Sequence, residues 1–585
     1  MRTSSKALFA SLLTVAAVGV AAQDRPESIL PPGFGEPAPR PTATATSAPA
    51  PSDPPGAVVQ PLPPGGNAPV PAPSATASAT PAATPSPIDP AVLARYEMPP
   101  YARRTLDQVG VAAELGPDAF GRADGGYLQA LMRRTAAPLP SRWLSILLRR
   151  ALVARIDTPA QLNGADFAAE RAWLLLRMGE SVAARAVVQG VDNANYTPKL
   201  FQVAMNAMLA TGDPAGLCPL AAAGRRATGE AGWTLAQPIC ASLAGEGARA
   251  RALFRTARRG RSATGIDLLL TEKVIGTGGQ GRQAVTIEWD GVDRLTAWRF
   301  GLAAATGVAI PDSLYGTAQA QVNYWRALSP SVPLGERIAP AEAAAGQGVL
   351  SNAALVDLYG AVDSDEESAS APSAAAQDLR AAYAERDAGT RLSALRQLWG
   401  DTPAWPRLVL TARAAARQPA RAEVAEVDAL VASMLSAGLD RQAARWSPHA
   451  PAGGKAWAMI AVSDPDRRGR MTLSDVQGFG GNDRARRLFF AGMAGLGRLS
   501  AEDIESGAQA LDMRIGQANS WTRALDRAAA AGEPGTVALL SAIGMQTSAW
   551  SGVPPESLYR IVSALRAVGL TGEARMIAAE AIARS

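Results

Sequence analysis

The sequence contains very few of the side chains on which metal and nucleophile chemistry depend. Among its 585 residues there is one histidine, His449, and there are two cysteines, Cys218 and Cys240. A histidine-based zinc site or a Ser-His-Asp triad would have to use His449, whose surroundings, RWSPHAPAGG, carry no signature of either. We therefore expect no catalytic residue, no metal site and no cofactor.

Two short motifs are spaced like ligand-binding loops, but their contexts contradict that interpretation. Gly276, Gly278 and Gly281 follow the GxGxxG pattern of a dinucleotide-binding loop, which needs a buried strand before it and a helix and a second strand after it. Only RQAVTIEWDG follows Gly281 before the next turn. Because no helix and return strand fit there, we predict a loop between helices.

The second motif, DPDRRGRMTLSD from Asp464 to Asp475, spaces its acids and glycine like a calcium loop. Arg468 occupies a ligand position, and the final acid is too short for easy bidentate coordination, so we predict a polar surface turn. Glu556-Ser557 resembles the catalytic Glu-Ser pair of lytic transglycosylases. The Gly-rich segment of that family does not follow it, so we do not assign that activity.

Long apolar runs are also missing, apart from one at the N-terminus. Arg2 and Lys6 precede an apolar stretch over residues 7–20, and small residues ending at Ala22 follow. This pattern predicts a secretory signal peptide over residues 1–22. A retained membrane anchor is the alternative, although the run is short for a spanning helix. We expect a periplasmic or secreted protein with no stable membrane span after cleavage.

Lysine is rare, although the formal net charge is +5. The chain's lysines are Lys6, Lys199, Lys273 and Lys455, and all other basic residues are arginines. Together with abundant alanine, this usage is typical of a GC-rich genome, here that of a Gram-negative bacterium. The arginines are spread along the chain, which indicates solvated helix faces and argues against a nucleic-acid partner.

The composition divides the chain into segments. Residues 23–90 are rich in Pro, Ala, Ser and Thr and cannot bury enough apolar surface to fold, so we predict a disordered, semi-rigid linker. Residues 362–378, VDSDEESASAPSAAAQD, predict a second, acidic linker. Helical periodicity dominates elsewhere, which predicts an N-terminal helical region over residues 91–361 and a C-terminal one over residues 379–585.

A spaced pattern of glycines is the most informative feature. Gly179, Gly212 and Gly245 are 33 residues apart, and each is followed by an acid and, five positions on, by Ala184, Leu217 or Ala250. Glycine ends a helix in the left-handed conformation, an acid suits the start of the next helix, and the fifth residue is expected to face inward. Looser copies are expected at Gly389 with Ala394, Gly438 with Ala443, Gly532 with Val537, and Gly569 with Ala574.

This pattern resembles degenerate tetratricopeptide or Sel1-like repeats, most clearly over residues 168–260. The resemblance implies an all-α fold in which helix pairs stack into an α-solenoid, and it implies protein binding along a concave surface. The consensus aromatic residues of the first helix are mostly missing, and a non-repeating helical bundle is the alternative.

Cys218 and Cys240 form an even pair, which in an oxidising compartment favours a structural disulfide over two buried free thiols. The repeat pattern places them on consecutive helices. Tryptophans such as Trp143, Trp233 and Trp399 are expected to anchor helix packing.

These observations predict an exported scaffold or adaptor that binds another envelope protein through an α-solenoid surface. A cell-wall glycan-processing enzyme or a glycan-binding accessory protein is the alternative, with peptidoglycan as its ligand. Exposed aromatic residues in an acidic groove would favour glycan binding, and paired carboxylates in a pocket would favour the enzyme. A groove lined by Asn, Arg and apolar residues would favour peptide binding.

Overall fold

A computed structural model describes residues 98–260, 263, 265–278, 285–364 and 371–585. The predicted signal peptide and the predicted linker, residues 1–90, lie outside this part of the chain. Residues 98–103, with the 3-10 helix η1 (Pro100–Ala102), belong to a separate contact unit. Residues 104–585 form the unit discussed below.

Where the structure describes it, this unit consists of 27 α-helices, four 3-10 helices and one two-stranded sheet, which confirms the predicted all-α class. The first helices are α2 (Gly125–Arg134), α3 (Arg142–Val153), α4 (Gly164–Arg177), α5 (Ser181–Gln189), α6 (Pro198–Ala210), α7 (Ala221–Thr228), α8 (Ala231–Leu243), α9 (Gly247–Arg259) and α10 (Ile266–Gly278). The middle helices are α11 (Ala297–Ala305), α12 (Asp312–Tyr315), α13 (Gln321–Leu328), α14 (Leu334–Gln347), α15 (Asn352–Asp363), α16 (Ala371–Ala384), α17 (Ala388–Trp399), α18 (Trp405–Ala415) and α19 (Val427–Ser436).

The last helices are α20 (Asp440–Ala444), α21 (Lys455–Ser463), α22 (Leu473–Gln477), α23 (Asp483–Gly495), α24 (Ala501–Ala510), α25 (Ser520–Ala530), α26 (Pro534–Gly544), α27 (Pro555–Ala567) and α28 (Thr571–Ala583). The 3-10 helices are η2 (Asn193–Asn195), η3 (Pro214–Leu217), η4 (Ser447–His449) and η5 (Trp550–Gly552). Strand β1 (Gln108–Val109) pairs antiparallel with β2 (Ile156–Asp157), with Val109 opposite Ile156.

The three evenly spaced glycines end helices as predicted. Gly179, Gly212 and Gly245 have φ of 86°, 66° and 79°. Each glycine N–H donates to the carbonyl three residues back, and the next N–H donates to the carbonyl five residues back, over 2.8 to 3.1 Å. This is the Schellman arrangement, which satisfies carbonyls that the helix leaves without partners.

The residue five positions after each glycine is buried, as predicted. Ala184, Leu217 and Ala250 are at most 1% exposed. The looser copies at Gly438, Gly532 and Gly569 also have positive φ, and the paired residues Ala443, Val537 and Ala574 are fully buried. The prediction for Gly389 is wrong, because this residue lies inside the first turn of α17, after the capping residue Asp387.

Each acid that follows one of these glycines lies at the start of the next helix. Two of these helices are α-helices, and the third is a short 3-10 helix. Glu180 and Glu246 immediately precede α5 and α9, and neither side chain makes a capping hydrogen bond. Asp213 does cap, accepting from the N–H of Gly216 at 3.1 Å, but the helix that it caps is the short η3. Pro214 stands at the first position of η3, where proline is tolerated because the helix leaves that N–H without a partner in any case.

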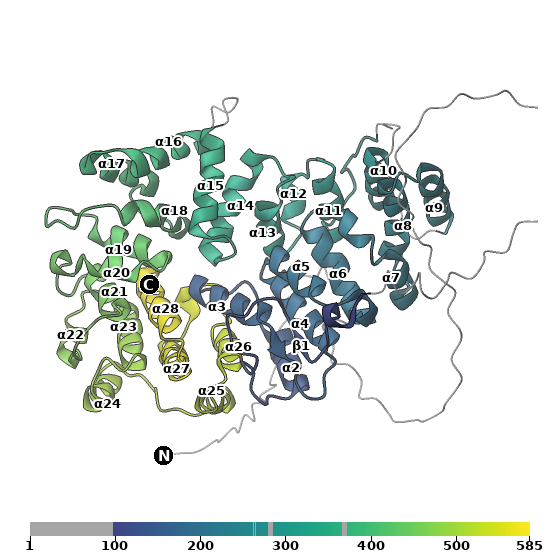
Figure 1. Cartoon of the computed structure of the whole chain (residues 1–585). Coiled ribbons are helices and arrows are strands. Elements are labelled where there is room, and N and C mark those ends of the chain that lie inside the picture. Colours follow the sequence, from purple (N-terminus) through teal and green to yellow (C-terminus); the bar gives the residue numbers. More distant parts are fainter. Residues whose placement is uncertain (1–97, 261–262, 264, 279–284, 365–370) are drawn as a thin grey trace, which may run out of the picture. The chain divides into compact units, whose positions relative to one another are not determined.

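Helices that follow one another in the chain pack together through much of the unit. Contacts join α4 to α5, α5 to α6, α6 to α7, α7 to α8, and α8 to α9, and a similar series runs from α13 to α19. Figure 1 shows these helices side by side, with α9 against α8 at the edge of the unit. This serial packing is what stacked helix pairs require.

The C-terminal helices depart from serial packing by returning to the N-terminal ones. Helix α3 contacts α26 and α28 as well as α14, and α2 contacts α26. At this junction the N–H of Gly535 donates to the Ala119 carbonyl at 2.7 Å, and the Thr536 hydroxyl donates to the Phe120 carbonyl at 3.3 Å. Elements more than 400 residues apart in sequence therefore share one core.

A buried arginine ties α3 to the ends of two other helices. The Nε of Arg142 donates to the carbonyl of Ser436, the last residue of α19, at 3.0 Å. Its Nη1 donates to the carbonyls of Leu350 and of Ala345 in the last turn of α14. Burial lowers the pKa of Arg142 to about 10. The carbonyl ends of the two helices offset part of this cost, because they carry partial negative charge.

The predicted acidic linker at residues 362–378 is largely wrong. Helix α15 continues to Asp363, and α16 begins at Ala371, where the alanine-rich sequence APSAAAQDLRAAYA favours a helix. Only residues 365–370 of that segment lie outside the described chain. Contacts of α14 and α15 with α18, and of α14 with α3, cross the predicted boundary, so the two helical regions form one unit.

Candidate interaction surface

The structure joins Cys218 and Cys240 by a disulfide, with their Cα atoms 5.3 Å apart. The two residues do not lie on consecutive helices, as the repeat pattern predicted. Cys218 follows η3, Cys240 lies in α8, and α7 comes between them. The bridge therefore links the end of η3 to α8 across α7, and neither cysteine lines either of the grooves described below.

The first loop-like motif lies partly in a helix and not in the predicted loop, whereas residues 464–472 of the second form the predicted turn before α22. Gly276 and Gly278 lie within α10, so the segment before them is helical, and Gly281 lies outside the described residues. In the second motif, the Asp475 carboxylate caps α22 by accepting from the backbone N–H and hydroxyl of Thr472 at 2.8 and 2.9 Å. A carboxylate engaged in this way is already satisfied by helix capping.

The other candidate residues are not brought together. His449 ends η4 and is partly buried, whereas Glu556 lies in the first turn of α27. Over the described part of the chain, no group of three or more His, Cys, Asp or Glu side chains could hold a metal ion. None of the described helices is long and apolar enough to cross a membrane.

The tryptophans serve as packing anchors. All 12 are buried or partly buried, and Trp233, Trp325, Trp446 and Trp550 are among the largest fully buried side chains. Trp173 and Trp399 are 5% exposed, and Trp143 and Trp298 are partly buried against the core. Within the unit of residues 104–585, Tyr127 is the one aromatic among the exposed large hydrophobic side chains.

Two buried carboxylates close to the repeats are paired with cations. Glu170 is fully buried and accepts from Arg133 at 2.7 Å, from Lys199 at 2.5 Å and from Gln129 at 2.6 Å. Glu180 is 5% exposed and accepts from Arg149 at 2.9 Å, and burial raises its pKa to about 7. Both carboxylates are held in the core, where a substrate could not reach them.

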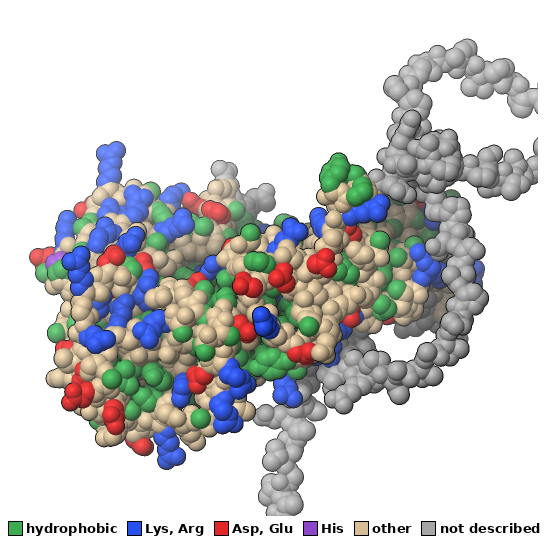
Figure 2. Space-filling model, turned by 60° about the horizontal axis from the view of Figure 1, so that its bottom comes forward, with side chains coloured by type: hydrophobic (Ala, Val, Ile, Leu, Met, Phe, Trp, Pro, Cys, Tyr) green, Lys and Arg blue, Asp and Glu red, His purple; other side chains and the backbone are tan. Residues whose placement is uncertain are grey.

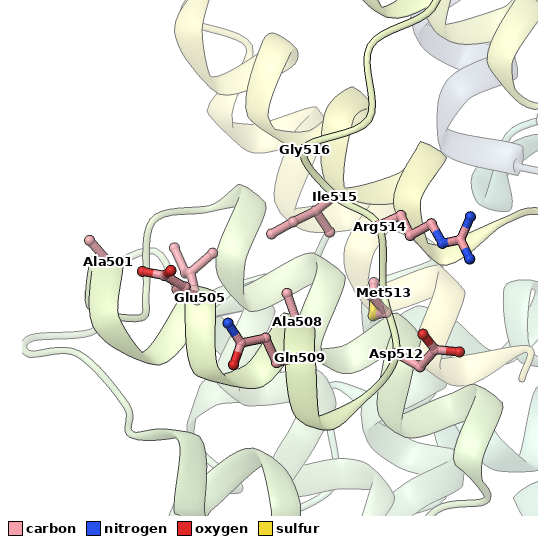
Figure 3. Close-up of a pocket in the computed structure, with 10 residues that line it drawn as sticks. Ala501, Glu505, Ala508, Gln509, Asp512, Met513, Arg514, Ile515 and Gly516 are labelled. Carbon is pink, nitrogen blue, oxygen red and sulfur yellow. The ribbon is translucent and has the colours of Figure 1, made fainter.

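A groove of about 440 Å³ runs along α24. We call it the α24 groove, and its lining consists of Ala501, Ile504, Glu505, Ala508, Gln509, Asp512, Met513, Arg514, Ile515 and Gly516. Figure 3 shows that α24 forms one wall and that the following loop, residues 512–516, forms the other. The α24 residues recur at three- and four-residue steps, so they share one face of the helix.

The α24 groove has an apolar floor and a polar rim. Met513 is 5% exposed and Ile504, Ala508 and Ile515 are partly buried, whereas Glu505, Gln509, Asp512 and Arg514 are exposed. No aromatic residue lines it. An apolar centre with a polar rim of both charges is the arrangement found where proteins bind peptide segments.

The two carboxylates of the α24 groove are not paired. In Figure 3 the Glu505 side chain lies at one end of the helix face, and the Asp512 carboxylate points away from it on the far side of the loop. Asp512 has φ of 49°, and its N–H donates to the Gln509 carbonyl at 3.2 Å, so the chain turns sharply there. Two-carboxylate hydrolysis needs both groups to face one bond.

A second groove of about 400 Å³ lies between β1 and α5. It is lined by Arg104, Gln108, Gly110, Val111, Arg155, Ala186, Gln189 and Gly190. Arg104 is held in place, because its Nη1 donates to the Gln189 carbonyl at 2.6 Å. Val111 and Val182 on the same side of α5 are 50% and 58% exposed. Like the α24 groove, this groove has no aromatic residue in its lining, and unlike the α24 groove it has no carboxylate.

Sequence reasoning did not locate either groove. Each combines short segments that are ordinary in isolation, and only the three-dimensional arrangement brings them together. The one local signal is the spacing of Ile504, Ala508 and Ile515, which is too weak to separate a groove from a core face.

On the molecular face in Figure 2, basic and acidic side chains are interspersed and hydrophobic side chains form small groups.

The chain matches no protein-family model, and it matches neither a curated protein nor a solved structure.

Proposed function

We propose that this protein is an exported scaffold or adaptor that holds another envelope protein, and that a segment of that partner binds in the α24 groove. The lining of the groove is the observation that carries the proposal. Its floor is aliphatic, from Ile504, Ala508, Met513 and Ile515, and its rim offers both charges and an amide. The N-terminal sequence, with an apolar run followed by a Pro-rich stretch, supports export and tethering.

The size of the groove fits a short segment. Helix α24 has 10 residues, which span about 15 Å at the usual helical rise. A partner helix of two or three turns, or an extended strand of about five residues, would cover its apolar floor. The exposed Glu505 and Arg514 would pair with charges on that segment. Orientation would be set by the opposite signs at the two positions.

The glycan-binding alternative receives less support. Carbohydrate rings stack on exposed aromatic side chains, and both grooves lack aromatic residues while the tryptophans are buried or partly buried. The enzyme alternative needs two carboxylates that face one bond, and Glu505 and Asp512 point apart. No observation favours glycan binding or catalysis over the adaptor proposal.

Site-specific photocrosslinking in the native bacterium tests the proposal. A photoreactive amino acid replaces Ala501, which is exposed and lines the groove, or Ala510, which is exposed on the opposite side of the same helix. We expect discrete protein adducts from position 501 and not from position 510. Ile504→Asp, combined with the probe at position 501, should abolish these adducts because it places a charge on the apolar floor.

Adducts of equal pattern at both positions, or adducts that survive Ile504→Asp, would overturn the groove as the binding site. Sedimentation with purified peptidoglycan provides the complementary test. Binding that is lost in Ile504→Asp would assign the groove to glycan instead of protein. Circular dichroism of the variant should match the parent chain, since α24 contacts few other helices.

A further inference from the structure

The positive charge of the chain is concentrated in one segment. Residues 221–260 contain seven arginines and two glutamates, which gives a net charge of +5, equal to the formal charge of the whole 585-residue chain. The even spread that the sequence suggested therefore applies to the rest of the protein but not to this segment. Five of the seven arginines belong to α9, and α9 contains no acidic residue.

The arginines of α9 share one exposed face. Arg251, Arg255, Arg258 and Arg259 follow one another at steps of four, three and one, so they lie within one side of the helix, and all four are exposed. The opposite side is the packed one, with Ala250 and Ala257 buried at 1%. Helix α9 packs on α8 and, less extensively, on α10.

Nothing near α9 neutralises this face in the described structure. Arg249 pairs with Glu246 at 2.8 Å, and the other four arginines have no ion pair among the described residues. Helix α8 contains no charged residue. On α10, Asp267 pairs with Arg299 at 2.9 Å, which leaves Glu272 as the only acid of α10 without such a partner.

Apolar side chains border the arginine face. Leu253 and Phe254 of α9 are partly exposed, and Phe254 lies four residues from Arg258 and so adjoins the basic side. The adjoining helices carry two of the exposed large hydrophobic residues, Leu243 at 43% and Leu269 at 39%. A strongly basic helix with apolar residues at its border is the pattern of helices that lie on membrane surfaces.

We propose that the exposed face of α9 binds the phosphate headgroups of an anionic lipid bilayer. The four arginines would contact lipid phosphates, and Phe254 would reach the boundary between the headgroups and the acyl chains. The arginines of this face offer a nucleic acid contacts to its phosphate backbone, and the one bordering aromatic, Phe254, is only partly exposed. An acidic protein would gain little from the partly exposed Leu253 and Phe254 beside the arginines, whereas a bilayer would bury them.

Vesicle flotation of the full chain tests this proposal with a charge-matched control. The test variant carries Arg251→Gln, Arg255→Gln, Arg258→Gln and Arg259→Gln. The control variant carries the same change at four exposed arginines outside this segment, namely Arg386, Arg421, Arg468 and Arg523. Both variants have the same net charge and the same N-terminal residues, so they differ only in where the charge was removed.

With vesicles of phosphatidylcholine and phosphatidylglycerol, we expect the test variant to lose about 100-fold or more in partitioning, while the control stays within a few-fold of the parent. Phosphatidylcholine alone should not distinguish the three proteins. Equal loss in both variants, or equal binding to both vesicle types, would overturn the proposal. So would a test variant that keeps vesicle binding but loses binding to duplex DNA or polyglutamate, because the face would then serve a different polyanion.

Discussion

Glu580, in the last helix, caps the start of α3 by accepting from the backbone N–H of Arg142 at 2.9 Å, although 438 residues separate the two. The same carboxylate accepts from the Ser141 hydroxyl at 2.7 Å, from the Trp143 N–H at 3.2 Å and from Arg584 at 2.9 Å. Glu580 is 2% exposed. Helix N-termini attract carboxylates, so this contact joins the two ends of the helical unit.

Replacing Glu580 should therefore destabilise the whole unit. Glu580→Ala leaves two buried N–H groups and the Ser141 hydroxyl without their acceptor, and we expect a loss of about 3 kcal/mol in the free energy of unfolding. Urea unfolding followed by circular dichroism measures it. Glu502→Ala, at an exposed site on α24, is the control and should cost about 0.5 kcal/mol or less. Similar losses in both variants would contradict a special role for the contact.

Glu180 should make stability depend on pH. Its folded pKa, about 7, lies above the ordinary 4.5, so the folded state holds this proton more tightly than the unfolded chain. The contribution of Glu180 to the free energy of unfolding must then fall as the pH rises from 4.5 to 7. Above pH 7 the folded state is destabilised by about 3 kcal/mol relative to its stability at low pH. Glu180→Gln should remove that decline. The free energy of unfolding of the variant, compared with that of the parent chain at the same pH, should therefore rise between about pH 5 and pH 8.

Glu246→Gln is the matched control for this pH effect. Glu246 follows Gly245 as Glu180 follows Gly179, but its side chain is 46% exposed. Because this side chain is not buried, its replacement should not abolish the decline in stability that the parent chain shows between pH 5 and pH 8. If the Glu180→Gln profile is parallel to that of the parent from pH 5 to 8, burial does not raise the pKa of Glu180 in the way described.

The disulfide should contribute measurably to stability. Cys218 and Cys240 are 22 residues apart, and closing a loop of that size contributes about 3 kcal/mol. Reductant should lower the unfolding midpoint of the parent chain and have no effect on the double variant Cys218→Ser, Cys240→Ser. If both thiols are alkylated in native protein isolated under acid quench, the pairing does not form in the cell.

The local features could be predicted from the sequence because they depend on residues close together in the chain. Left-handed glycines at 179, 212 and 245, and the buried residue after each one, follow from turn chemistry and helical period alone. The contact of Glu580 with α3 could not be predicted, since no periodic signal links residues 438 positions apart. The α24 groove depends on where a loop crosses a helix, which composition does not specify.

Two predictions from the sequence, a linker and a helix-ending glycine, were wrong for physical reasons. The acidic, Pro-containing stretch around Asp363 suggested a linker, but the alanines after Ala371 favour a helix and α16 has a neighbour on which to pack. Gly389 resembled a helix-ending glycine, yet Asp387 caps α17 ahead of it, with its carboxylate accepting from the Thr390 N–H at 2.7 Å. A strong N-cap thus decided where that helix begins.

Two Gly→Ala changes, one at a glycine turn and one inside a helix, should have opposite effects on stability. Gly245 has φ of 79° and nothing close to the position of an added methyl group, so Gly245→Ala tests backbone strain alone and should destabilise by about 1–2 kcal/mol. Gly360 lies inside α15 with equal space around it, and Gly360→Ala should stabilise by about 1 kcal/mol through helix propensity. Hydrogen exchange shows where each effect acts: Gly245→Ala should speed exchange in α8 and α9 together. Faster exchange in one of these helices alone would mean that the pair does not fold as one unit.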